Sequence, residues 1–187
     1  MNIQKLIEVV AYILARNDNQ MDYYNLIKEC YIVDRKSIQK TGYAITGDSY
    51  VSMNRGPVLR NLYALIKNKS SLPEEQALWN KYFVVDDAHK IKLQTPVTKH
   101  FLLSRSDENL LNEVCQQFYK YTYSQMKEYS HQEGVFPEWK PVGKGEEEPI
   151  PIETIMKTLG FCDKDIQIII EEQKAFEQEK KVLCNLN

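Results

Sequence analysis

Hydrophobic residues recur at helical spacing in the first forty residues and predict two amphipathic helices. Up to Arg16, charged residues separate apolar residues that share one helical face. These apolar residues are Ile3, Leu6, Ile7, Val10, Ile13 and Leu14. The same spacing returns from Leu26 to Ile38, and Gly42 follows as a candidate left-handed helix cap. Two helices are therefore expected before residue 42.

Residues 41–58 form a segment punctuated by glycine and proline. Three of the seven glycines in the chain lie here, at Gly42, Gly47 and Gly56. Such punctuation predicts a structured loop, with one short strand at residues 49–53. Pro57 predicts the start of another helix, because proline is favourable at the first helical position. A loop of this kind serves either packing or recognition.

The second half of the chain alternates helical and strand patterns. A hairpin is expected from residues 82–85 and 90–93, and it could form one small sheet with the strand at 49–53. Helix starts are predicted from three serines and an aspartate that precede apolar repeats. They are Ser71, Ser106, Ser124 and Asp163. The fold expected is mainly α (α+β), a single helical domain over residues 1–187 with a small antiparallel β-sheet or hairpin.

Residues 132–151 interrupt this pattern. Five of the prolines and glycines of the chain, together with three consecutive glutamates, lie between Pro137 and Pro149. Neither a helical nor a strand period is visible across the segment. We expect an exposed loop here.

Composition narrows the function classes. The 24 basic and 26 acidic residues nearly cancel, so the net charge of −2 creates no field that would attract a nucleic-acid backbone. The four cysteines are widely spaced and form no Cys-x-x-Cys pair, so neither a zinc site nor a disulfide framework is predicted. No apolar run approaches the length of a membrane span. These features predict a soluble, cytoplasmic protein that needs no metal or cofactor.

His131 is the histidine best placed for acid–base chemistry, but no nucleophile lies at a recognisable spacing from it. The usual phosphate-binding, dinucleotide-binding, zinc-protease and hydrolase motifs are absent. A structural, hydrogen-bonding role for His131 is therefore favoured, and catalysis is not expected.

Four residues of the 41–58 segment are candidates for partner binding. Asp48 and Arg55 could form an ion pair that holds the loop, which is the favoured interpretation, or could face a partner. Tyr43 and Tyr50 are candidates because tyrosine is enriched where protein surfaces meet. In an alternative hypothesis the chain is a winged-helix-like nucleic-acid-binding regulator. Its DNA-facing basic residues would be Lys36, Lys40, Arg55 and Arg60.

Two runs of sequence resemble the signature of the Panacea domain, the family of SocA-like antitoxins. The first run covers residues 28–35, and the second reads Ile-Thr-Gly-Asp-Ser-Tyr-Val-Ser-Met-Asn-Arg-Gly-Pro-Val over residues 45–58. The later hairpin, the long helix from Leu110, the Ser-His pair followed by a tryptophan, and the isoleucine-rich end are also similar to that family. Glu29 and Cys30 stand where the family more often has apolar residues. The interval between His131 and Trp139 is also longer than usual in the family.

The resemblance implies a protein that binds proteins. Members of the family neutralise a co-encoded toxin by direct contact, some act as adaptors that hand the toxin to a protease, and many lie on prophages or other mobile elements. It implies a structural role for a set of motif residues. These are Gly42, Gly47, Gly56, Pro57, His131 and Trp139.

Overall fold

A computed structural model describes residues 1–97 and 99–184 of the chain. Eight helices and two three-stranded antiparallel sheets lie within these ranges. The predicted mainly α (α+β) fold is confirmed. Across the same residues, no helix combines the length and the apolar character needed to cross a membrane.

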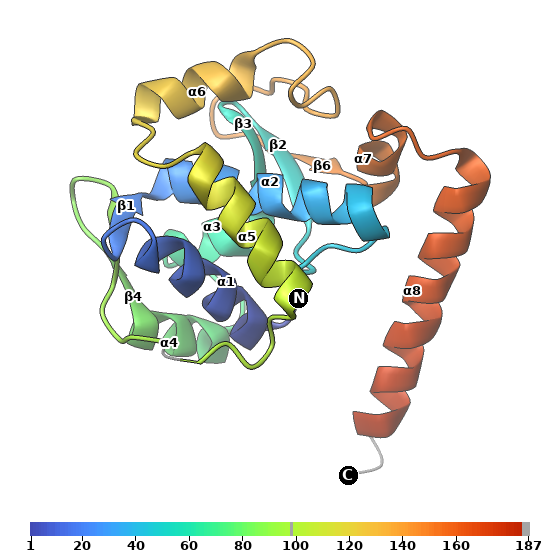
Figure 1. The fold of residues 1–187 in the computed structure, drawn as a ribbon, viewed down its shortest axis with the longest axis horizontal. Coiled ribbons are helices and arrows are strands. Elements are labelled where there is room, and N and C mark those ends of the chain that lie inside the picture. The colour runs from blue at the N-terminus through green and yellow to red at the C-terminus, as the bar shows by residue number, and fades with distance from the viewer. Residues whose placement is uncertain (98, 185–187) are drawn as a thin grey trace.

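Helix α2 (Tyr23–Thr41) is the central element, and α1 (Ile3–Ala15) packs beside it (Figure 1). Every residue of α2 from Tyr24 to Asp34 is buried, so this stretch is covered on all sides rather than on one stripe. Gly42 ends α2 in the left-handed conformation (φ 79°), as its position predicts. The other elements are arranged around α2.

The first sheet has the strand order β1-β5-β4. Strands β4 (Phe83–Val85) and β5 (Lys90–Leu93) form the predicted hairpin. Strand β1 (Gln20–Asp22) pairs with β5, where Met21 lies opposite the fully buried Ile91. Helix α4 (Pro73–Tyr82) leads directly into β4. The predicted cap Ser71 is wrong, because α4 begins at Pro73 after Leu72 and has no side-chain cap.

The second sheet has the order β3-β2-β6 and is built around β2 (Tyr50–Met53). Its neighbours are β3 (Gly56–Leu59) and β6 (Glu148–Ile150). The expectation that the 49–53 strand joins the later hairpin is therefore wrong. The prediction of a helix starting at Pro57 is also wrong, because Pro57 lies in β3, an edge strand where a missing N–H is tolerated, and α3 (Arg60–Ile66) starts after it.

Helices α5 (Arg105–Gln117) and α6 (Tyr123–His131) each start two residues earlier than predicted. Their caps are Ser104, which forms a reciprocal capping box with Asp107, and Thr122, which does so with Gln125. In each case the competing serine, Ser106 or Ser124, lies inside the first turn. Each helix starts after the residue that has a capping partner three positions later, Asp107 for Ser104 and Gln125 for Thr122.

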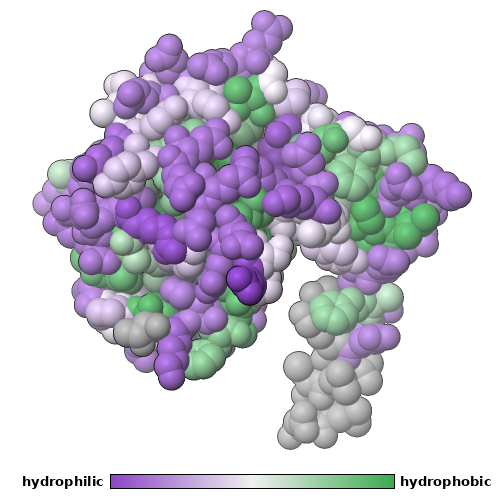
Figure 2. Space-filling view, viewed as in Figure 1, coloured by the Kyte–Doolittle hydropathy of each residue, from purple (hydrophilic) through white to green (hydrophobic). Residues whose placement is uncertain are grey.

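The C-terminal helices are α7 (Ile152–Thr158) and α8 (Asp163–Cys184), and α8 projects away from the body of the protein (Figure 1). The start of α8 is anchored by the buried Ile166. Figure 2 shows hydrophobic side chains gathered on the lobe formed by α7 and the beginning of α8. On α8, 46% of Ile168 and 56% of Phe176 are exposed. The side chain of Cys184 lies outside the described part of the chain.

Residues 132–147 contain neither helix nor strand, and most of their side chains are exposed. Phe136 and Glu138 are exceptions, since only 5% of each is exposed. Strand β6 lies inside the range 132–151. Val135 and Trp139 are half-buried and also pack against the core, so the segment contacts the core through several side chains as well as through β6.

Candidate partner-binding site

The β2–β3 hairpin turns at Asn54 and Arg55, with both side chains exposed. Met53 pairs with Gly56 across the turn, and Gly56 has a φ of 105° that residues with a side chain rarely adopt. The tight turn places Arg55 at the tip of the hairpin. This tip is the exposed end of the segment that the sequence singled out.

Three side chains from outside the hairpin bond to alternate carbonyl groups around its turn. Nε1–H of Trp139 donates to the carbonyl oxygen of Met53 at 2.9 Å. The Tyr24 hydroxyl donates to the carbonyl of Arg55 at 3.0 Å. The Lys28 ammonium donates to the carbonyl of Pro57 at 2.5 Å. Helix α2 and the 132–147 segment thus fix the turn from both sides.

Lys28 is fully buried, and this burial lowers the pKa of its amino group to about 7. A Cβ atom at position 56 would lie 2.8 Å from Lys28 Nζ. Glycine is therefore required at this position both for its backbone angle and for space. The lysine on the helix and the Gly-Pro pair on the hairpin form one structural unit, although 27 residues or more separate them in the sequence.

His131 and Trp139 pack against each other, with ring centroids 5.0 Å apart and planes inclined by 55°. Burial and the nearby charges of Lys127 and Lys28 lower the pKa of His131, against the opposing effect of its hydrogen bond to the backbone of Arg55. We define the hairpin surface as Arg55, His131 and Trp139 with Asn54. Arg55 and His131 are exposed and Trp139 is half-buried.

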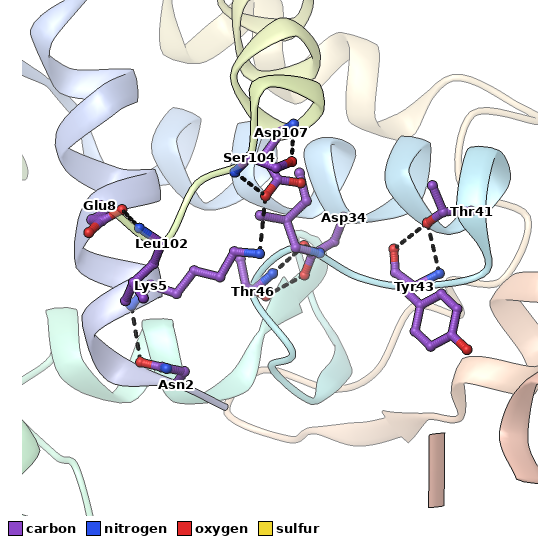
Figure 3. Close-up of polar contacts among 11 residues, drawn as sticks. Asn2, Lys5, Glu8, Asp34, Thr41, Tyr43, Thr46, Leu102, Ser104 and Asp107 are labelled. Atoms are coloured by element: carbon purple, nitrogen blue, oxygen red, sulfur yellow. Dashed lines mark hydrogen bonds and ion pairs between the residues drawn. The ribbon is translucent and has the colours of Figure 1, made fainter. Parts of the chain in front are cut away.

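Asp34, a fully buried residue of α2, binds the first half of the 41–58 segment (Figure 3). Its carboxylate accepts hydrogen bonds from the backbone N–H groups of Ile45 and Thr46 and from the hydroxyl groups of Thr46 and Tyr50. Burial raises the pKa of Asp34 to about 6, and these hydrogen bonds oppose the rise. The sequence analysis missed Asp34, because an aspartate within a helical repeat carries no local signal of such a role.

Asp48 is buried and caps helix α3. Its carboxylate accepts from the backbone N–H groups of Ser49, Asn61 and Leu62 and from the Asn61 side chain, at 2.7–3.1 Å. A carboxylate at this position accepts from the unpaired N–H groups of the first helical turn, and its negative charge interacts favourably with the positive end of the helix dipole. Asp48 therefore has a structural role, although its partners lie in α3 and not at Arg55.

Glu138 ties the 132–147 segment to the core. Its carboxylate accepts from the Tyr31 hydroxyl at 2.7 Å and from Arg35 Nε at 2.9 Å, both on α2. It also accepts from the Thr158 hydroxyl at 3.1 Å, at the end of α7. This network holds Trp139 in register with the hairpin turn, and neither Glu138 nor Arg35 was singled out from the sequence.

The structure separates the four predicted partner-binding residues. Asp48 and Tyr50 are buried, and their polar atoms are bonded inside the protein. Tyr43 and Arg55 are exposed but lie at opposite ends of α2, a helix of 19 residues that spans about 28 Å. Tyr43 donates to Glu172 of α8 at 3.1 Å. Only Arg55 shares a surface with the motif residues His131 and Trp139.

A family model described as "Antitoxin SocA-like, Panacea domain" matches residues 26–140. The chain belongs to this family. The match covers well over half of the 187 residues. Neither the curated proteins nor the solved structures compared with the chain gave a match.

The Panacea match runs from the first turn of α2 to the residue after Trp139, so it contains the hairpin with Lys28, His131 and Trp139. Tyr24, which also bonds to the hairpin turn, lies just before it. Helices α1, α7 and α8 and strand β6 lie outside it. All four residues of the hairpin surface lie within the matched range.

Two of the four basic residues of the nucleic-acid hypothesis are paired with carboxylates. Lys36 is paired with Glu113 at 2.5 Å, and Arg60 is paired with Glu147 at 2.7 Å. Their carboxylate partners cancel much of the charge that would attract phosphate groups.

Proposed function

We propose that this Panacea-domain chain is a non-catalytic antitoxin that binds and neutralises a toxin protein encoded by a neighbouring gene. The observation that carries the proposal is the family match over residues 26–140. Buried side chains hold the hairpin turn in place, and this rigidity suits a binding surface better than a reaction centre. The lysine and both aspartates of the unit, Lys28, Asp34 and Asp48, serve backbone groups of the protein itself.

The hairpin surface is our proposed contact with the toxin. Arginine and tryptophan are enriched among residues that dominate binding energies, and both occur here beside an exposed histidine. Three hydrogen bonds hold the turn before any partner arrives, so little conformational entropy would be lost on binding. Tyr43, at the other end of α2, would be contacted only by a partner that spans the length of this helix.

Co-expression tests the antitoxin function. The neighbouring gene is induced alone and together with this chain, and growth and the level of the toxin are followed. We expect growth arrest without the chain and growth with it. A neighbouring gene that is harmless alone, or that stays equally toxic beside this chain, would reject the proposal.

The level of the toxin separates two forms of neutralisation. Direct inhibition leaves the toxin present in the rescued cells and co-purifying with this chain. Proteolytic adaptation makes the toxin disappear from rescued cells and return when the proteases of the host are deleted. We favour direct inhibition, because it needs only the one contact that the hairpin surface offers.

A further inference from the structure

A cavity of about 310 Å³ opens beside the first turns of α2, between strand β1 and the loop that joins α5 to α6. We call it the α2–α5 cavity. Asn25 and Glu29 line it from α2, and Phe118, Tyr121 and Tyr123 line it from the segment between the end of α5 and the start of α6. It is separate from the hairpin surface, none of whose residues lines it.

Two residues of this cavity are buried and each has one oxygen atom without a hydrogen-bond partner. Only 3% of Asn25 and 1% of Glu29 are exposed. Asn25 Oδ1 and Glu29 Oε2 have no hydrogen-bond partner among the described residues. Because the two residues are four positions apart on α2, they share one face of the helix. A buried acceptor without a partner destabilises a protein, and most buried polar atoms have a partner, so a pair of such acceptors on one helix face points to a ligand.

The polar groups that line the cavity favour a ligand that donates hydrogen bonds. The Asn25 amide group already donates to the carbonyl oxygen of Tyr121 at 2.7 Å, so Asn25 presents its oxygen to a ligand. Glu29 likewise presents a carboxyl oxygen. Two acidic and two basic residues, Asp18, Asp22, Lys90 and Lys120, also line the opening, so their charges balance. Burial raises the pKa of Glu29 to about 8, and a cation bound beside Glu29 would favour its charged carboxylate form. A ligand that fits this lining carries N–H donors and a positive charge.

The aromatic side chains narrow the choice further. Phe118 and Tyr121 meet edge to face with ring centroids 5.2 Å apart, and together with Tyr123 they give the cavity an aromatic wall. A guanidinium group is planar, donates from several N–H groups in a fixed fork, and packs against aromatic rings. A lysine ammonium is compact and more strongly hydrated, so it matches such a wall less well.

We propose that the α2–α5 cavity binds a guanidinium group, donated by an arginine side chain of a protein or by a small guanidine compound. The two acceptors of α2 receive its N–H groups, and the aromatic wall covers its face. This site does not depend on the proposed antitoxin function, since its test uses the chain alone.

Nuclear magnetic resonance titration with matched probes tests the site. The probes are N-acetyl-arginine amide, the citrulline analogue, in which a neutral urea replaces the guanidinium, and the lysine analogue. We expect saturable shifts of the backbone amides of Asn25, Glu29 and Tyr121 with the arginine probe, and a Kd on the order of 1 mM for a fragment of this size. Citrulline and lysine should bind about tenfold more weakly, because charge and fork geometry both contribute.

Two variants complete the test. Glu29→Gln keeps the shape of the side chain and removes the carboxylate, and it should weaken binding of the arginine probe by about tenfold. Glu74→Gln, an exposed change on α4, is the matched control and should leave binding unchanged. Equal binding of all three probes, binding that Glu29→Gln does not alter, or an absence of saturable shifts at the cavity would each overturn the proposal.

A last comparison identifies the source of the guanidinium. Agmatine represents a small guanidine compound, and an arginine-centred pentapeptide represents a protein. Tighter binding of the peptide assigns the site to a protein side chain, and tighter binding of agmatine assigns it to a small molecule. Either result supports the site, and an absence of binding by both agmatine and the peptide rejects it.

Discussion

The buried ammonium of Lys28 donates to the carbonyl oxygen of Pro57 at 2.5 Å and would lie 2.8 Å from any Cβ atom at position 56. This relationship explains why a lysine on a helix and a Gly-Pro pair on a distant strand occur together in the sequence. The lysine satisfies a carbonyl on the open edge of β3, and the glycine makes room for it. The same contact holds the hairpin turn that carries Arg55.

Gly56→Ala should destabilise the protein by about 2–4 kcal/mol, because it combines an unfavourable positive φ with a clash against Lys28. Gly134→Ala is the matched control, since Gly134 also has a positive φ (81°) but has no atom within 4 Å of an added Cβ. It should cost only about 1 kcal/mol. Urea unfolding of the two variants measures the difference, and equal losses would show that the contact with Lys28 imposes no constraint.

Arg55→Ala should weaken toxin binding by at least about tenfold while the free energy of unfolding changes by less than about 0.5 kcal/mol. The side chain is exposed, and the structural hydrogen bond at this position uses its backbone carbonyl, which the substitution retains. Calorimetric titration with the purified toxin measures the affinity. Lys69→Ala, another exposed loss of positive charge, is the control. If both variants bind equally well, the hairpin surface is not the contact.

Asp48→Ala should destabilise the protein by about 2–4 kcal/mol, since three backbone N–H groups and the Asn61 side chain lose their acceptor. Thermal and urea unfolding measure the loss. Asp87→Ala, in the exposed turn between β4 and β5, should leave stability nearly unchanged. A neutral effect of Asp48→Ala would contradict its role as the cap of α3.

Glu29→Gln should make the stability of the protein less sensitive to rising pH. Burial raises the pKa of Glu29 from 4.5 to about 8, so between these values the folded state binds more protons than the unfolded state. The contribution of Glu29 to stability is therefore present below pH 4.5 and is lost as the pH rises through about 8. Glutamine has no group that titrates in this range, so the variant loses this pH dependence.

The free energy of unfolding of Glu29→Gln should therefore exceed that of the natural chain by an amount that grows from pH 5 to pH 8. This difference should reach on the order of 1–3 kcal/mol. Urea unfolding at intervals of one pH unit follows the difference. Glu74→Gln serves again as the exposed control and should show a constant difference. A difference for Glu29→Gln that is also constant with pH would mean that this carboxyl is ionised in the folded protein.

The burial of Tyr50 changes the design of binding experiments. Its hydroxyl donates to Asp34 and its ring meets Tyr31 at 5.6 Å, so truncation to alanine would remove core packing as well as a hydrogen bond. Loss of toxin binding in such a variant would report unfolding and not recognition. Arg55 and Tyr43 are the members of the predicted set that can be tested by truncation.

Local periodicity predicted most helices and the β4–β5 hairpin, because these depend on residues close together in the chain. It also predicted Gly42 as a cap, since a left-handed residue at a helix end is a local requirement. The competition between Ser104 and Ser106 was decided by a single capping partner, which is why this boundary was missed. Pro57 was misplaced because a proline suits both a first helical turn and an edge strand.

The sequence by itself determined the helical framework, the turn residues of the 41–58 segment and the membership of the Panacea family. Tertiary structure alone decided which polar residues face inward. Lys28, Asp34 and Glu138 look like solvent-facing residues in the sequence, yet each is buried because a backbone or side-chain group from a distant segment meets it. Burial of a charged group depends on partners that only the folded chain brings together, and for this reason Asp48 and Tyr50 belong to the scaffold while Arg55 remains at the surface.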